Sequence, residues 1–158
     1  REAAKQAADR GIRLAHQCHT TSVFETVDQI LANLKANGQP NFGLIYEPAN
    51  LMLCGEPYGV DTLRQLAPHL MNVYIQNHRL DEAGPVSLPT YCRDEVRFHH
   101  LPIWEAGGVE TAEVFTGLRE INWTGHFTIH QAESIETNED ARDYAKRCAD
   151  FVRDFESI

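Results

Sequence analysis

Carboxylate, imidazole and amide side chains follow short apolar runs at three places in this 158-residue sequence. Gln17 and His19 end the first run, Glu47 and Asn50 follow the second, and His130 ends the last. A carboxylate and an imidazole can bind Mn²⁺, Zn²⁺, Mg²⁺ or Co²⁺, with Gln17 or His19 as a further ligand. An imidazole also titrates near neutral pH, so it can exchange protons with a substrate. A hydrogen-bonded polar cluster without metal is the alternative, and His19 and Asn50 also suit hydrogen bonding to a polyol.

A second polar set lies farther along the chain. Gln76, Asn77 and Arg79 follow another apolar run, and the Arg79 guanidinium is suited to a bidentate contact with a phosphate or carboxylate. A solvated loop is the alternative reading. Trp104 can stack on a sugar ring, although such a residue more often fills a gap in the core, and Glu105 can transfer a proton.

The elements that must position these residues are read from the apolar periodicity, which alternates between strand-like and helix-like. Strands are predicted at about 12–19, 42–47, 70–77 and 125–131, with a short extended piece at 96–103. Helices are predicted at about 2–10, 61–66, 109–120 and 137–156, and another ends at Asn37-Gly38. Ser22 and Glu25 have the spacing of a capping box for that helix.

Strands that alternate with helices predict a parallel sheet with right-handed crossovers, either an open doubly wound sheet or part of a barrel. No G-x-G-x-x-G motif follows a strand, which disfavours a dinucleotide-binding fold. The polar residues follow the C-terminal ends of the strands, where barrel active sites are built. A complete barrel needs about 250 residues, so this α/β chain is expected to form one domain, 1–158, that is about half of a (β/α)₈ barrel.

Side-chain parity supports the barrel. Alternate residues of a strand point to opposite faces, so Gln17 and His19 share one face, as do Tyr74 and Gln76. In the last strand, Phe127 and Ile129 are expected to pack on helices, while His126, Thr128 and His130 look into the barrel.

Composition excludes several classes of protein. The formal net charge is −9 and no Lys/Arg cluster occurs, which argues against nucleic-acid binding. No apolar window of about 18 residues suggests a membrane span. The four cysteines are scattered without a C-x-x-C pair, which fits a reducing cytoplasm.

Five segments occur in an order that resembles a known family. They are Gln17-Cys18-His19, Glu47-Pro48-Ala49-Asn50, Tyr74-Ile75-Gln76-Asn77, Glu105-Ala106-Gly107-Gly108-Val109-Glu110 and Gly125-His126-Phe127-Thr128-Ile129-His130. The order resembles the C-terminal half of the sugar phosphate isomerase/epimerase family, the xylose isomerase-like TIM barrels, which also include endonuclease IV.

The resemblance implies a metal-assisted isomerase or epimerase that acts on a sugar, sugar phosphate or related polyol through an enediolate. The family's metal positions fall on Gln17, Glu47, Tyr74 and His130, where only Glu47 keeps a carboxylate. Its two proton-exchanging glutamates correspond to Gln17 and His130. These substitutions leave a non-catalytic sugar-binding barrel as the alternative, and Glu105 as a candidate replacement for proton transfer.

The resemblance also implies a partner, because four strands cannot close a normal barrel. An N-terminal half-barrel of about four βα units, or a second copy of the chain, is expected to complete it. An endonuclease IV-like activity is disfavoured by the acidic surface and by the small number of metal ligands.

Overall fold

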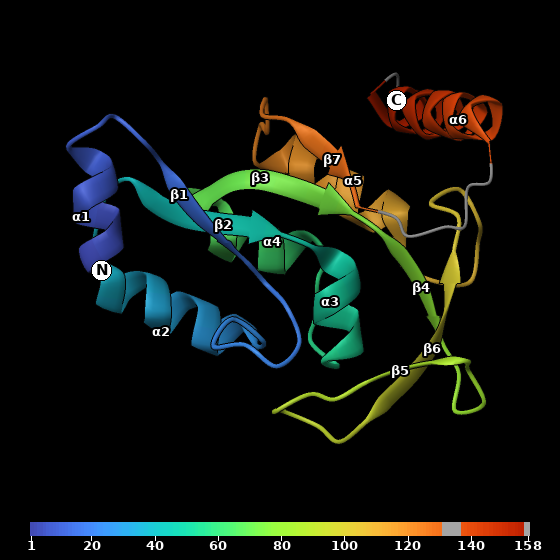
Figure 1. Cartoon of the computed structure of the whole chain (residues 1–158), viewed down its shortest axis with the longest axis horizontal. Coiled ribbons are helices and arrows are strands. Elements are labelled where there is room, and N and C mark those ends of the chain that lie inside the picture. The colour runs from blue at the N-terminus through green and yellow to red at the C-terminus, as the bar shows by residue number, and fades with distance from the viewer. Residues whose placement is uncertain (131–136, 157–158) are drawn as a thin grey trace.

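The computed structural model describes residues 1–130 and 137–156 (Figure 1). Its main sheet has four parallel strands in the order β1-β2-β3-β7. They are β1 (Leu14–Gln17), β2 (Phe42–Tyr46), β3 (Leu70–Ile75) and β7 (Phe127–Ile129). All four strands were predicted from the sequence, although residue 131, the predicted end of the last one, lies outside the described residues.

Helices connect the strands, as the alternating periodicity predicts. They are α1 (Glu2–Ala8), α2 (Val27–Asn37), α3 (Pro48–Leu53), α4 (Val60–Leu66), the short 3₁₀ helix η1 (Ala67–His69), α5 (Thr111–Glu120) and α6 (Asn138–Glu156). Helix α3 was not predicted, because six residues are too few to show a helical period. It begins directly after β2 with Pro48 in its first turn, where the missing N–H of proline costs no helical hydrogen bond.

The predicted capping box of α2 is wrong by one turn. Thr26 is the N-cap, its side chain accepts the Gln29 N–H, and the Gln29 side chain accepts the Thr26 N–H. Ser22 instead lies in the preceding turn, where its hydroxyl donates to the His19 carbonyl at 2.8 Å. Glu25 is buried and turns its carboxylate away from α2. Both pairs have the same spacing, and only the path of the loop distinguishes them.

The two faces of the main sheet differ in burial. Val73 and Ile75 on β3 are buried in the core, whereas Asn72 and Tyr74 on the opposite face are only half-buried. On that opposite face, Asn72 donates to the Thr128 hydroxyl at 3.1 Å. The predicted parity is therefore confirmed: the apolar face packs on helices, and the polar face is the one that would look into a barrel.

A second, antiparallel sheet has the order β4-β6-β5. It consists of β4 (Asn77–Leu80), β5 (Val86–Leu88) and β6 (Val96–Leu101), and it extends beyond the C-terminal end of β3 (Figure 1). Its own small core joins Val96 and Phe98 to Leu53 of α3. The sequence predicted only one extended piece here, because β4 and β5 are too short and too polar to show a strand pattern.

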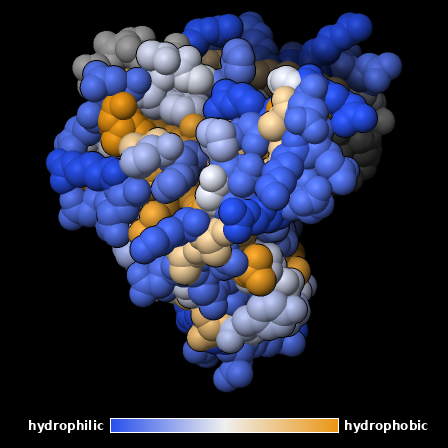
Figure 2. Space-filling view, turned by 90° about the vertical axis from the view of Figure 1, so that its left-hand side faces the viewer, coloured by the Kyte–Doolittle hydropathy of each residue, from blue (hydrophilic) through white to orange (hydrophobic). Residues whose placement is uncertain are grey.

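Among the described residues, no helix has both the length and the apolar character that crossing a bilayer requires. The face seen in Figure 2, on the side of α1 and α2, is mainly hydrophilic with separated hydrophobic patches.

Gly43 provides a test of how tightly β2 and β3 are packed. A Cβ atom there would lie 2.5 Å from the His69 carbonyl oxygen and 2.7 Å from Met71 Cγ. We expect Gly43→Ala to lower the free energy of unfolding by about 1–3 kcal/mol, because the backbone carbonyl cannot move away without disturbing β3. Urea denaturation measures the change. Ser87→Thr, which adds one methyl group on β5, is the control, and equal stability of the two variants would contradict the prediction.

Candidate functional site

Glu47 is the centre of the polar cluster at the C-terminal edge of the main sheet. Its side chain is fully buried, and three side chains from other parts of the chain contact its carboxylate. Gln17 Nε2 and Asn50 Nδ2 both donate to Oε2, the latter at 2.7 Å. His130 Nδ1 lies 3.1 Å from Oε1. Four of the residues singled out from the sequence therefore meet at one carboxylate.

The position of Glu47 follows from the local backbone. It comes directly after β2, and it is the N-cap residue of α3 in an extended conformation. Its main chain is paired with Cys18, since the Glu47 N–H donates to Cys18 Sγ at 3.0 Å and the thiol donates to the Glu47 carbonyl at 3.4 Å. Cys18 follows β1 directly, and its place between Gln17 and His19 turns its side chain to the side opposite theirs, although no role was predicted for it.

His130 reaches Glu47 across an intervening strand. It follows β7, and its N–H donates to the Ile75 carbonyl at 2.9 Å, which extends the parallel ladder. Neighbouring strands lie about 4.8 Å apart, so β2 and β7, with β3 between them, are separated by about twice that distance. The side chains of Glu47 and His130 therefore converge over β3, where the Tyr74 ring lies 5.2 Å from the imidazole.

Burial governs the electrostatics of the cluster. It raises the pKa of Glu47 above its usual range, and the neighbouring His130 and the Gln17 amide limit that rise by favouring the carboxylate. Among the described residues, His130 is the one basic side chain that forms an ion-pair contact with Glu47. The imidazole is half exposed, with 49% of the side chain accessible, so it can exchange protons with a molecule in front of the sheet.

The donor set is compatible with a divalent cation. Glu47 offers a carboxylate, His130 an imidazole and Gln17 an amide. Rotation of the Gln17 amide group by 180° would exchange its nitrogen for its oxygen, which can bind a cation. A cation would also replace the hydrogen-bond donors that now compensate a buried negative charge.

His19 and Gln76 lie at the edge of the cluster. His19 is exposed, its Nδ1 is 2.9 Å from the Thr20 carbonyl, and its charge lowers the pKa of Glu47. Gln76 is half-buried directly after β3, on the same parity as Tyr74. Both remain candidate contacts for a polar substrate.

Asn77 corrects the sequence-based prediction of a substrate contact. It is 1% exposed, and its amide donates to the carbonyls of Pro102 and Glu105 at 2.9 and 2.8 Å. Its Oδ1 accepts the Val109 N–H at 2.9 Å. Asn77 thus fixes the loop before α5. The same contact explains Gly108, where a Cβ atom would lie 2.1 Å from Asn77 Oδ1, and the Gly107-Gly108 pair is a close-packed turn.

None of the described hydrogen bonds joins Trp104, Glu105 or Arg79 to Gln17, Glu47 or His130. Trp104 packs against α6, with its ring 5.3 Å from Tyr144 and the Arg147 guanidinium 4.0 Å from its centre. Trp104 and Glu105 line a cavity of about 200 Å³ whose walls do not include Gln17, Glu47 or His130. Arg79 is exposed near Gly107. Trp104 therefore packs on α6, and its contact with a sugar ring stays a prediction.

The fold and site define a class of protein: a parallel α/β sheet with a buried carboxylate and an imidazole at its C-terminal edge, as in half of a (β/α)₈ barrel. Residues 1–155 match the sequence model of the Xylose isomerase-like TIM barrel family. The chain belongs to this family, as its motif order had indicated.

Solved structures agree with this assignment at low sequence identity. A xylose isomerase domain protein from Planctomyces limnophilus is 17% identical with a TM-score of 0.69, and the match covers 99% of this chain and 51% of that one. A D-allulose 3-epimerase from Methylomonas sp. is 19% identical with a TM-score of 0.67, covering 96% and 51%. A xylose isomerase-like protein from Mycobacterium smegmatis, in complex with magnesium, is 20% identical with a TM-score of 0.63, covering 92% and 45%.

The chain thus spans about half the length of the structures that it matches. The fold prediction of a half-barrel is confirmed. No curated protein matches the sequence.

The contact between Glu47 and His130 leads to a prediction about titration. In metal-free protein we expect the pKa of Glu47 to lie above its usual range, and to rise further in His130→Ala, because the imidazole favours the carboxylate. A ¹³C NMR titration of the carboxyl carbon measures both values. Since the folded state then binds this proton more tightly than the unfolded chain does, Glu47 increasingly opposes folding as the pH rises from the ordinary to the raised pKa.

His126→Ala is the matched control for this titration. His126 precedes β7, and no contact described in the structure joins it to Glu47. An unchanged Glu47 pKa in His130→Ala would show that the contact does not exist in solution.

Proposed function

We propose that this protein forms the C-terminal half of a metal-assisted isomerase or epimerase that acts on a sugar, sugar phosphate or related polyol through an enediolate. The observation that supports this most is the buried Glu47 carboxylate with Gln17, Asn50 and His130 around it. Family membership supports a sugar-modifying reaction, and the site lies where barrel enzymes place their chemistry.

Gln17, Glu47 and His130 are the residues that would hold a divalent metal, with Mn²⁺, Zn²⁺, Mg²⁺ or Co²⁺ as the candidates. Such an ion would supply Lewis-acid polarisation of the substrate's carbonyl and hydroxyl oxygens. The magnesium complex of the Mycobacterium smegmatis protein supports a metal in this family.

His130 is the residue in the cluster best suited to move a proton. When Nδ1–H donates to Glu47, Nε2 carries the lone pair and can accept a proton from carbon or oxygen. The lone pair of Nε2 can bind either a metal or a proton, so His130 is either a metal ligand or the base. If His130 is a ligand, Glu105, in the loop before α5, is the remaining candidate for proton transfer.

Substrate recognition is assigned to side chains around the cluster. Asn50, His19 and Gln76 offer donors and acceptors for sugar hydroxyl groups. Arg79, which is exposed, is suited to a phosphate or carboxylate group on the substrate.

A non-catalytic sugar-binding barrel is the second candidate function. Gln17 has no ionisable group. The resemblance to the family implies that Tyr74 stands at a metal position, and its ring lies 5.2 Å from that of His130. A site with one carboxylate can retain hydroxyl binding after losing its proton-transfer pair.

A partner that completes the barrel is part of the proposal. The polar face of the main sheet is only half-buried, and β1 and β7 lie at the two edges of this sheet. An N-terminal half-barrel, or a second copy of the chain, would cover both. All four cysteines are free thiols, which supports a reducing compartment such as the cytoplasm.

Metal content and proton exchange test the proposed reaction. We expect about one equivalent of Mn, Mg, Co or Zn in the complete barrel by elemental analysis, and its loss in Glu47→Ala. Incubation with D-fructose or its 6-phosphate in D₂O should label the carbon next to the carbonyl, because enediolate formation exchanges that hydrogen. His130→Ala should slow the exchange by about 10²–10⁴-fold.

Glu110→Ala, at the N-cap of α5, is the control and should keep both metal and exchange. Glu105→Gln tests which residue transfers the proton: slower deuterium exchange in this variant would assign the transfer to Glu105, and unchanged exchange would leave it with His130. If calorimetry shows that the protein binds the sugar but the sugar takes up no deuterium, the proposed enzyme activity is contradicted and the non-catalytic sugar-binding barrel is favoured.

A further inference from the structure

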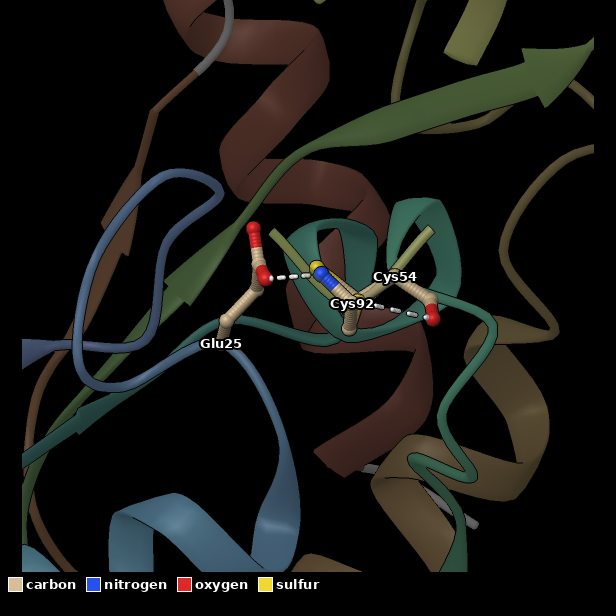
Figure 3. Close-up of side chains that lie close together, drawn as sticks. All are labelled: Glu25, Cys54 and Cys92. Carbon is tan, nitrogen blue, oxygen red and sulfur yellow. Dashed lines mark hydrogen bonds between the residues drawn. The ribbon is translucent and has the colours of Figure 1, made fainter. Parts of the chain in front are cut away.

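Three side chains with metal-binding atoms meet outside the Glu47 site. They are Glu25, before α2; Cys54, which ends α3; and Cys92, between β5 and β6. One ligand atom of each lies within 4.8 Å of the other two. Figure 3 shows them side by side, with a hydrogen bond from the Cys92 N–H to Glu25 and one from the Cys92 thiol to the Cys54 carbonyl at 3.4 Å.

Glu25 is a buried carboxylate that is kept ionised by the backbone. It is 1% exposed, and it accepts N–H groups of Thr21, Tyr91 and Cys92 at 2.7 to 2.8 Å. Burial alone would raise the pKa of Glu25, but the donors of Tyr91, Thr21 and Cys92 together hold it below its usual value. None of the described ion pairs includes Glu25, so a cation would compensate its charge.

The two thiols complete a donor set for a soft cation. Cys54 is buried and Cys92 is exposed, so the cluster is open to solvent on one side. Burial raises the pKa of both thiols, and the charge of Glu25 adds to this for each of them. Without a cation they remain protonated, while a bound cation would favour the thiolates.

We propose that Glu25, Cys54 and Cys92 form a zinc site that is separate from the Glu47 cluster. Zinc binds both thiolates and carboxylates, usually in tetrahedral geometry, and water from the open side would be the fourth ligand. The Tyr91 N–H is shared between both Glu25 oxygens, so one oxygen can bind the cation while the other keeps this donor. Binding replaces two thiol protons, which are released to solvent, and no oxidation is involved.

The surrounding charges favour a cation. Glu56, two residues after Cys54, accepts the N–H of Val27, two residues after Glu25, at 2.9 Å. Arg93 lies near Cys54, since a Cβ atom on Gly55 would be 2.9 Å from its Nη1. With Glu25, these side chains carry one net negative charge before either thiol ionises.

The site would have a structural consequence. It would join the loop after β1, the end of α3 and the loop of the small antiparallel sheet, three segments at the same edge as the Glu47 cluster. A metal there would hold the rim of the proposed active site in place without contacting substrate.

Cobalt titration of chelator-treated, reduced protein tests the site. We expect a thiolate-to-cobalt charge-transfer band whose final intensity corresponds to one thiolate-bound Co²⁺ per chain, and which disappears when Zn²⁺ is added. Cys92→Ser should weaken Co²⁺ binding at least about 10-fold, and circular dichroism checks that this substitution of an exposed residue leaves the fold intact. With two protons released, affinity should rise by up to about 100-fold per pH unit below the thiol pKa.

Two variants act as controls. Cys148→Ser removes a thiol on α6 and should keep the band, and Glu47→Gln should also keep it, which separates this site from the proposed catalytic metal. Absence of the band in the unaltered protein would overturn the proposal. A Cys54–Cys92 disulfide, seen as a loss of two hydrogens by mass spectrometry of protein purified with reductant, would also overturn it.

Discussion

The buried Glu47 carboxylate is the constraint on which the rest of the candidate site depends. A charge at the sheet edge with no accessible surface must be compensated locally, because removing it from water costs several kcal/mol. The compensation comes from β1 through Gln17, from the first turn of α3 through Asn50, and from the end of β7 through His130. The need to satisfy one carboxylate therefore sets the relative positions of three elements, and it keeps an imidazole facing the open side of the sheet.

Hydrogen bonds with a structural rather than a catalytic role stabilise the same edge of the sheet. Cys18 pairs with the main chain of Glu47, so the carboxylate cannot shift along β2 without breaking two contacts. Asn77 holds the loop before α5 through backbone carbonyls and an N–H. Glu25 likewise holds the loop before α2 and the loop between β5 and β6 through backbone N–H groups, and the proposed zinc site would further stabilise these two loops. Buried polar residues of this kind order the rim, while the reactive groups remain accessible.

Much of the fold was predictable because period-2 and period-3.6 patterns report directly which face of an element is buried. The four parallel strands, the long helices and the opposite faces of Phe127 and Thr128 followed from such patterns. Short elements did not: α3, β4 and β5 have too few residues for a period to appear. The α2 cap was misplaced because Ser22–Glu25 and Thr26–Gln29 have the same spacing, and the choice depends on the loop path.

The sequence by itself determined the fold class and family, since strand–helix alternation, polar strand ends and motif order are all written along the chain. The resemblance to the family also implied that Gln17 and His130 stand where other members carry carboxylates. Only the tertiary structure decided which polar residues share a site. It joined Glu47 to His130 across β3, buried Asn77 under the loop before α5 and packed Trp104 on α6. It also brought Glu25, Cys54 and Cys92 together from three loops, a juxtaposition invisible in sequence because contacts between distant segments depend on packing rather than on spacing.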